Sequence, residues 1–339
     1  MPVLIKILQL IVSLSILVFV HELGHFVFAR IFKTRVEKFY LFFDPWFSLF
    51  KIKRGETEYG IGWLPLGGYV KIAGMIDESL DREQMKKPPQ PYEFRSKKAW
   101  QRLLIMVAGV IFNVIFAMLI YVSVLYVWGE TYLPTSSVKY GIVTDSVGYS
   151  IGLRNGDKIL SVDNQYIDNF MQITPDIVLN SRKTIQVDRA GEKFDIDIPE
   201  SLVPQMLKGK GRIEPRVPFS PFIVSGFGKE SPGKLAGMQV NDELVGIDGN
   251  KFEWYDEFQA YLADNKTRDV ALNILREGVN IDIPVKPTSA GLIGVTTSRS
   301  LDSFFELKTI KYGLLESIPA GISKGFKTIG DYLKQFKLI

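Results

Sequence analysis

The chain has 339 residues, of which 46% are hydrophobic and 23% are charged, and its formal net charge is +4. The mild charge gives no indication of a nucleic-acid partner, and the absence of cysteine excludes disulfide bonds and thiolate zinc ligands. The length allows two or three ordinary domains. The average composition conceals a strong division, because two early stretches carry almost no charge while the middle of the chain has the composition of a soluble protein.

The first apolar stretch, residues 5–32, predicts a transmembrane helix. It exceeds the roughly 20 residues that a helix needs to cross about 30 Å of hydrocarbon. A signal peptide is the alternative, but its apolar region would be about 7–15 residues long and would end at a small-residue cleavage site, which this stretch lacks. We therefore expect a retained membrane span.

Residues 33–98 are expected to form a β-rich loop associated with the membrane. The segment 39–50, "FYLFFDPWFSLF", is very aromatic for a loop and is expected to lie at the membrane interface. The stretch 54–75 alternates apolar and polar residues, which predicts short strands. The expected turns are at Gly55, Pro65 and Gly67-Gly68.

The second apolar stretch, residues 99–128, predicts a second transmembrane helix. Lysine and arginine cluster between the apolar cores of the two spans, residues 8–32 and 103–128, whereas only Lys6 precedes the first core. The positive-inside rule then makes the loop cytoplasmic and places the N-terminus and everything after Trp128 on the outer side. The basic residues of the loop that lie near the spans are Lys33, Arg35, Lys38, Arg95, Lys97, Lys98 and Arg102.

An internal repeat follows the second span. Gly152, Asp157 and Asp163 recur 85 residues later as Gly237, Asp242 and Asp248. Because this offset is the size of a small domain, we expect two tandem copies of one fold, at 133–205 and 206–288. Each copy should contain a β-hairpin, the first turning near Ala190-Gly191 and the second at Glu277-Gly278.

The pattern "G-L-x-x-G-D-x-I-L-x-V-D" of the first copy resembles PDZ domains, which are six-stranded partial barrels with two helices. The second copy has Asn241 where PDZ domains usually have glycine, a tolerable change because asparagine accepts a positive φ better than most residues. Peptide ligands of these PDZ-like domains are therefore expected partners.

The C-terminal segment, residues 300–339, is expected to be amphipathic. Within residues 313–339 its large apolar residues recur at steps of three and four, and its lysines fall elsewhere on the helical wheel. This pattern predicts a basic helix that lies on the membrane. The segment carries too much charge to span a bilayer.

The chemistry lies in "HELGH", residues 21–25, which holds the only two histidines of the chain. On a helix, His21 and His25 share one face and can reach one zinc ion, and Glu22 can take a proton from a zinc-bound water. Ionisable residues in hydrocarbon are costly and normally functional, which weighs against coincidence and against a pair of core histidines. A soluble zinc protease would need a polar domain around the motif, but the flanks are lipid-like.

These features together resemble the site-2 protease family, specifically the bacterial RseP-type intramembrane zinc metalloproteases. The resemblance rests on HELGH in the first span, on the tandem PDZ-like repeats, and on two further stretches. These stretches are "GWLPLGGYVKIAGM" (62–75) and "FRSKKAWQRLLIMVAGVIFNVIFA" (94–117).

The resemblance implies a multi-pass α-helical membrane protein with a membrane-associated β-rich loop and two α+β PDZ-like domains, located in the bacterial inner membrane. It implies Zn²⁺ bound by His21 and His25, with Glu22 as the catalytic base and Asn113 close to the active site. The implied substrates are transmembrane segments of single-span proteins, such as anti-sigma factors or signal-peptide remnants.

The chain departs from the family pattern in two respects. Val110 stands where the family usually has proline. The family also takes a third zinc ligand from an Asp in "L-D-G" on a later span, whereas the only Asp-Gly pair here, Asp248-Gly249, belongs to the second repeat. We therefore expect the chain to stop before the later spans. The alternative is a catalytically inactive, membrane-anchored PDZ scaffold.

Four residues of the loop are candidates for holding the substrate as an added strand. Glycine lets another backbone approach closely, and an extended peptide can pair with the edge of a sheet. The alternative is that these strands only shield the site and that the glycines are there to form turns. The candidates are Gly67, Gly68, Tyr69 and Val70.

Overall fold

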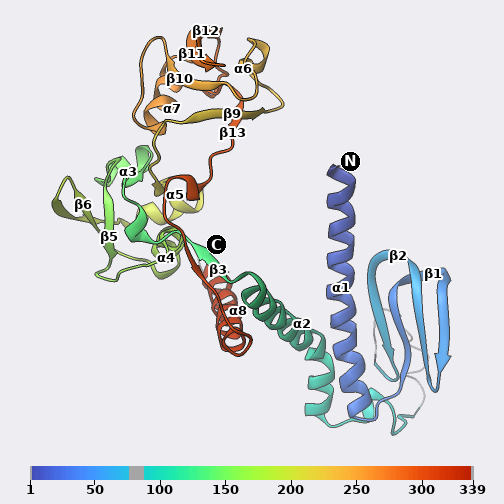
Figure 1. Ribbon diagram of the computed structural model, residues 1–339. Helices are drawn as coiled ribbons and strands as arrows, with labels where there is room; N and C mark the ends of the chain where they lie inside the picture. The colour runs from blue at the N-terminus through green and yellow to red at the C-terminus, as the bar shows by residue number, and fades with distance from the viewer. Residues whose placement is uncertain (1, 76–87, 337–339) are drawn as a thin grey trace. The chain divides into compact units, whose positions relative to one another are not determined.

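The computed structural model describes residues 2–75 and 88–336. The chain divides into two compact units, and helices and strands are labelled in Figure 1. The first unit comprises Met1–Trp128 and Tyr312–Gly330, and the second comprises Gly129–Lys311 and Asp331–Ile339.

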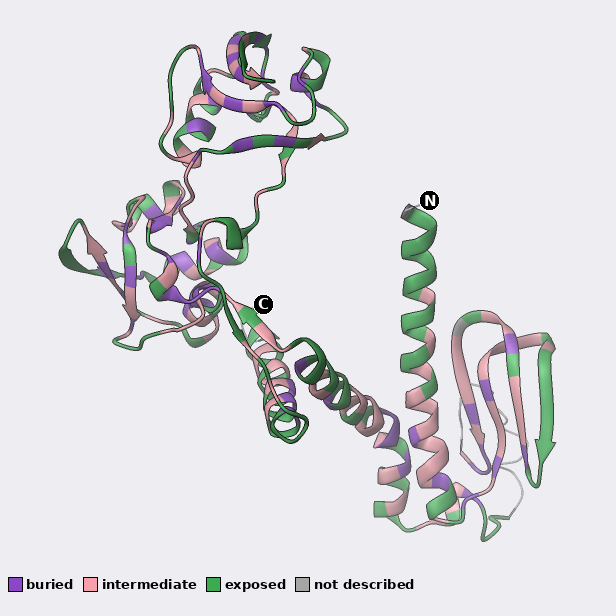
Figure 2. Ribbon diagram, in the orientation of Figure 1, coloured by how far each residue is buried: buried purple, intermediate pink, exposed green. Residues whose placement is uncertain are grey.

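Two long apolar helices occupy the positions of the expected spans. Helix α1 covers Pro2–Ile31 and α2 covers Ala99–Trp128, and both are long and apolar enough to cross a membrane. Most residues in the first half of α1 are exposed, as Figure 2 shows, and nearly all of them carry large apolar side chains. A continuous apolar surface of this kind is stable in lipid rather than in water. The architecture fits a membrane protein with β-rich regions.

Helices α1 and α2 pack closely through small residues. A Cβ atom added at Gly24 of α1 would lie 2.4 Å from the carbonyl oxygen of Ala108 on α2. Ala29 and Ala108 are fully buried. Small residues allow such an approach between helices in a membrane, where packing rather than water exclusion holds them together. The glycine inside HELGH therefore brings the histidine-bearing face of α1 against α2.

Strands β1 (Val36–Arg54) and β2 (Thr57–Ile72) form an antiparallel sheet beside α1 (Figure 1). Each strand is long enough to contribute two separate segments to the sheet. Tyr40 of β1 pairs with Gly60 on one side and with Tyr69 on the other, and residues 50–54 pair back onto the start of β2. The segment 68–72 is therefore an outer segment of the sheet, and within the described residues it pairs on one side only.

The register of the sheet corrects one expectation about this region and agrees with another. Residues 39–50 lie within β1 rather than in a loop, and the turn at Gly55 is confirmed. Residues 38–41 pair with 58–61 in ascending order but with 68–71 in descending order, so β2 reverses its direction between Ile61 and Gly68, where the turns at Pro65 and Gly67-Gly68 are expected. The reason is that irregular pairing with several register shifts lets the strands bend without ending. Stacked rings, with 5.3 Å between the centroids of Tyr40 and Tyr69, hold the bent strands together.

The repeat is visible in the order of elements in the second unit. In both halves a strand, a short helix, a strand, a longer helix and a hairpin follow one another. In the first half these are β4 (Ile142–Val143), α3 (Ser146–Ser150), β5 (Lys158–Val162), α4 (Ile173–Asn180), β6 (Thr184–Arg189) and β7 (Glu192–Asp197). In the second half they are β9 (Phe222–Phe227), α6 (Pro232–Leu235), β10 (Glu243–Ile247), α7 (Tyr255–Asp264), β11 (Val270–Arg276) and β12 (Val279–Val285).

Both predicted hairpin turns are confirmed, because Ala190-Gly191 and Glu277-Gly278 have positive φ angles between paired strands. Strands β5, β6 and β7 form one sheet, and β12, β11, β10, β9 and β13 (Val295–Thr297) form another. The remaining elements are β3 (Glu130–Tyr132) paired with β14 (Lys308–Ile310), β8 (Glu214–Pro215) paired with β4, and α5 (Val203–Leu207).

Each half of the second unit has its own hydrophobic core. One cluster of buried residues runs from Leu133 to Ile213 and includes Phe305, and the other runs from Phe219 to Ile293. Separate cores are what two consecutive small domains require. The boundaries 133–205 and 206–288 and the PDZ-like identity of the two halves remain predictions.

The same buried ion pair occurs in both halves. Arg189 Nε lies 2.7 Å from Asp157, and Arg276 Nε lies 2.7 Å from Asp242. Burial favours the neutral form of Asp242, but hydrogen bonds from Arg276 and from the backbone N–H of Gln239 hold the pKa of this carboxyl below its ordinary value. The repeated aspartate of the sequence pattern therefore anchors the strand that precedes each hairpin turn.

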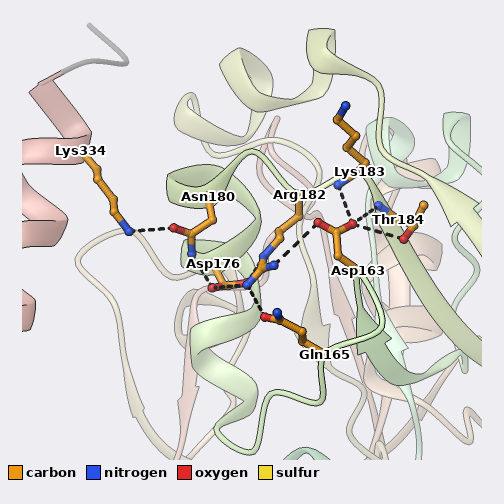
Figure 3. Close-up of polar contacts among 8 residues, drawn as sticks. All are labelled: Asp163, Gln165, Asp176, Asn180, Arg182, Lys183, Thr184 and Lys334. Carbon is orange, nitrogen blue, oxygen red and sulfur yellow. Dashed lines mark hydrogen bonds and ion pairs between the residues drawn. The ribbon is translucent and has the colours of Figure 1, made fainter.

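A second repeated aspartate closes the turn after β5. Asp163 accepts hydrogen bonds of 2.9 Å from the backbone N–H groups of both Lys183 and Thr184. Arg182 lies between two carboxylates, 3.8 Å from Asp163 and 2.7 Å from Asp176 (Figure 3). Desolvation raises the pKa of Asp163, but the two backbone donors hold it below its ordinary value. This cluster joins the turn to helix α4.

Helix α8 covers Leu314–Phe336, so the helix is shorter than the predicted amphipathic segment, whose last three residues lie outside the described part. Its buried residues are the small ones at four-residue steps, Ser317, Gly321 and Gly325. A Cβ at Gly321 would lie 2.6 Å from the backbone nitrogen of Val122 in α2. The large apolar side chains of α8 remain exposed. In its last turn, Lys334 donates to Asn180 at 2.7 Å (Figure 3).

We predict that the Asp242–Arg276 pair stabilises the second half far more than an exposed pair does. Replacing Arg276 with Met leaves a carboxylate that is only 1% exposed without its guanidinium. Because Arg276 itself is one-quarter exposed, we expect a loss of about 2–3 kcal/mol, just below the range for a fully buried pair. The measurement is hydrogen exchange of the β10 and β11 amides in the intact protein.

Arg212→Met is the matched control, because Arg212 and Glu214 are both about half exposed. Its expected cost is below about 1 kcal/mol. Equal protection of the β10 and β11 amides in both variants would contradict this account of the fold.

Candidate metal and catalytic site on the first helix

The second half of α1 carries His21, Glu22 and His25 into a cavity of about 460 Å³. The opposite wall of this cavity is the outer segment of the sheet. The chain therefore brings the helix motif and the strand edge into one site, although more than 40 residues separate them in sequence. The other lining residues are Lys38, Phe43, Gly68, Tyr69, Val70, Lys71, Ile72 and Met75.

The two imidazoles have the spacing of a metal-binding pair. Their Nε2 atoms are 3.1 Å apart. Two nitrogens that bind one zinc tetrahedrally at the usual bond length are about 3.3 Å apart. The His25 Nδ1 atom lies 2.7 Å from the carbonyl oxygen of Ile105 on α2, so Nδ1 carries the proton and donates, which leaves a lone pair on Nε2. These two nitrogens fit two of the protein ligand positions of a zinc ion.

Gly109 of α2 lies directly against the imidazoles. A Cβ atom at this position would be 2.6 Å from the Nε2 atoms of both His21 and His25. Any side chain at residue 109 would therefore fill the space on which the two nitrogens converge. Gly109 is not among the site residues expected from the sequence. The available signal was that it is the only glycine of the apolar stretch 99–128.

Asn113 lies one turn further along α2, and its Nδ2 atom is 3.4 Å from His21 Nδ1. The structure thus places Asn113 beside the motif, where the family resemblance expects it. Val110, which replaces the family's proline, is 59% exposed. It lies on the outer face of α2, so this departure from the pattern does not alter the site.

The four residues expected to hold the substrate as an added strand occupy different places. Gly68, Tyr69 and Val70 line the cavity, whereas a Cβ at Gly67 would meet the ring of Phe43 instead. A Cβ at Gly68 would lie 3.7 Å from the Glu22 Cγ atom and still closer to other atoms of the sheet and of α1. The glycine at position 68 therefore lets the strand lie directly against the helix at Glu22.

Tyr69 is held rigidly at the cavity wall. Its hydroxyl donates to Asp44 at 2.9 Å, and its ring stacks between the rings of Tyr40 and Phe43. Burial, reinforced by the neighbouring Asp44 carboxylate, raises the pKa of Tyr69 far above its ordinary value. The phenol therefore stays protonated, and its contribution to the site is positional.

A catalytic zinc site needs a third protein ligand besides His21 and His25. Across residues 2–75 and 88–336, no group of three His, Cys, Asp or Glu side chains is placed to hold a metal ion. Asp248-Gly249, the only Asp-Gly pair of the sequence, forms the turn after β10, as the repeat predicts.

Comparison with known proteins bears on the family of the chain. The model of peptidase family M50 matches residues 9–338. A Helicobacter pylori protein named "Putative zinc metalloprotease" is 34% identical over 343 residues, which make up 96% of this chain and 87% of that protein. Similarly named proteins of Borreliella burgdorferi and Rickettsia conorii are 29% and 33% identical. The chain spans only 60% and 55% of these two relatives' lengths.

Gly109→Ala tests the packing of α2 against the histidines. The added methyl group would lie within 2.6 Å of both Nε2 atoms, so the rings must move apart. Overpacking of this kind costs about 1–3 kcal/mol, which corresponds to a loss of zinc affinity of about 5- to 150-fold. The measurement is the zinc content of the purified protein during titration with a chelator.

Gly330→Ala is the control, because an added Cβ at this helical position meets no atom within 4 Å. It should leave zinc affinity unchanged and favour the α8 helix slightly. Full zinc retention by Gly109→Ala would show that the two helices are not packed as described.

Proposed function

The chain belongs to peptidase family M50, the site-2 protease family, and on that basis we propose that it is an intramembrane zinc endopeptidase that cleaves transmembrane segments of single-span proteins. The observation that carries the proposal is the cavity in which His21, Glu22 and His25 face the sheet segment that starts at Gly68. The metalloprotease names of the relatives support this reading over an inactive PDZ scaffold.

In this proposal the Nε2 atoms of His21 and His25 hold the zinc. When bound, zinc supplies a Lewis acid that polarises the scissile carbonyl and makes water acidic enough to react at neutral pH. Glu22, adjacent to His21 in the same cavity, accepts a proton from the attacking water and delivers it to the leaving amine. Lipid around α1 and the sheet over the cavity keep bulk water out, which strengthens these charge interactions.

The substrate is bound as a strand. Peptide bonds of a transmembrane helix are sheltered by their own hydrogen bonds, so a span must be unwound before it can be cut. Residues 68–72 offer a sheet edge that, among the described residues, is paired on one side only. An extended substrate segment that pairs there would lie along the cavity wall and present its peptide bonds to Glu22.

We further propose the location of each part. The protein is a multi-pass protein of the bacterial cytoplasmic membrane, with the β1–β2 loop on the cytoplasmic side and the N-terminus and the second unit outside. The distribution of lysine and arginine around α1 and α2 supports this orientation. The two halves of the second unit act as PDZ-like peptide-binding domains that select or sense substrates on the outer face.

Glu22→Gln should abolish proteolysis while zinc binding remains. Glutamine keeps the size of the side chain but cannot accept the proton, so cleavage of a single-span model substrate should fall by about 10²-fold or more. The readouts are the cleavage rate in detergent or vesicles and the zinc content of the same sample. Undiminished cleavage would disprove the assignment of Glu22 as the base.

Proline in the sheet edge tests substrate binding. Neighbouring residues of a strand direct their N–H groups to opposite sides, so in one of Tyr69→Pro and Val70→Pro the lost donor points outward and not toward β1. That variant should lose most of its cleavage activity and retain its zinc. Lys53→Pro, on the other outer segment of the same sheet, is the control and should cleave normally. Normal cleavage by both Tyr69→Pro and Val70→Pro would exclude this edge as the binding site.

A further inference from the structure

One face of α2 supplies a contact to each histidine at steps of four residues. The carbonyl of Ile105 accepts from His25, Gly109 leaves room for both rings, and Asn113 approaches His21. Residues at these steps lie on one side of a helix. The two histidines are therefore matched by two groups that can fix their orientation, one from the backbone and one from a side chain.

The hydrogen bond to Ile105 sets the tautomer of His25. The contact between Asn113 and His21 leaves one atom of the amide without a hydrogen bond. The Nδ2 atom of Asn113 lies 3.4 Å from His21 Nδ1, while the Oδ1 atom of the same amide is buried and accepts no hydrogen bond from any described residue. A buried acceptor without a donor costs about 1–3 kcal/mol. An amide turned by 180° keeps its shape and exchanges its oxygen and nitrogen.

Metal binding decides which orientation of the amide fits. If His21 binds zinc through Nε2, the neutral ring must carry its proton on Nδ1. A proton on Nδ1 would then face the two N–H donors of Asn113, and no hydrogen bond could form. With the amide turned, Oδ1 faces Nδ1–H, and one exchange satisfies both the buried oxygen and the ring proton.

We propose that Asn113 is a positioning residue whose Oδ1 accepts a hydrogen bond from His21 Nδ1–H in the zinc-loaded protein and so holds Nε2 ready for the metal. The inference rests on the proposed zinc-binding role of His21. Asn113 acts through the imidazole, because Nδ1 lies on the opposite side of the ring from the ligating Nε2. Ile105 and Asn113 are then equivalent partners for the two ligands.

The test compares two substitutions in the full-length natural protein purified in detergent. Asn113→Leu keeps the approximate size and removes the acceptor, whereas Asn113→Asp keeps an acceptor in the same place. Loss of a partner of this kind lowers metal affinity by about 10–100-fold. We expect that loss for Leu and near wild-type or tighter binding for Asp, measured by competition with a zinc chelator.

A second readout reports the hydrogen bond itself. Residues 1–339 contain only two histidines, so ¹⁵N-labelled histidine gives just two ring signals from this part of the protein. In the zinc-loaded wild type, both rings should carry a proton on Nδ1. Asn113→Leu should shift the Nδ1–H resonance of His21 and leave that of His25 in place, which also shows that the helices remain packed. Asn113→Val serves as a second variant if the leucine does not fold.

Wild-type zinc affinity in both the Leu and Val variants, or a zinc-loaded His21 ring with its proton on Nε2, would overturn the inference and leave the proposed protease intact. Failure of the wild-type protein to bind zinc would instead overturn the proposed function, and the inference with it.

Discussion

The site depends on one constraint, which is the close approach of two apolar helices. Gly24 and Ala108 bring the backbones of α1 and α2 together, and Gly109 leaves the space in which two imidazoles converge. Polar side chains in hydrocarbon are costly unless protein groups satisfy them. Here those groups come from α2, so a larger residue at either glycine would separate the histidines from the partners that make their presence in the membrane tolerable.

The same logic explains why a sheet accompanies the helices. A helix alone can present HELGH, but it offers no place to bind an unwound peptide. In the proposed mechanism the outer segment that starts at Gly68 adds that place, and the lack of a side chain at Gly68 lets the strand lie against Glu22. Stacked aromatic rings and the hydrogen bond from Tyr69 to Asp44 make this wall rigid, so chemistry and substrate contact share one fixed cavity.

The parts of the structure that follow from local sequence could be predicted. Length and hydropathy located both apolar helices, the glycines of the hairpin turns located the strands around them, and the spacing of His21 and His25 predicted the candidate site. The parts that depend on distant partners could not be predicted. Residues 39–50 became a strand because β2 pairs with them, and Gly109 gained its role only through the rings that face it. Helix α8 buries its small residues because α2 lies against them.

The position of Gly109 along α2 also sets the depth at which the proposed protease can cut. Arg102 is the last charged residue before an uninterrupted uncharged run to Trp128. Gly109 follows it by seven residues, which at the rise of a helix is about 10 Å. A hydrocarbon core is about 30 Å thick, so the site lies roughly a third of the way in from the Arg102 end. A substrate would then need to unravel only that end of its span, and a change in bilayer thickness would alter which of its peptide bonds is within reach.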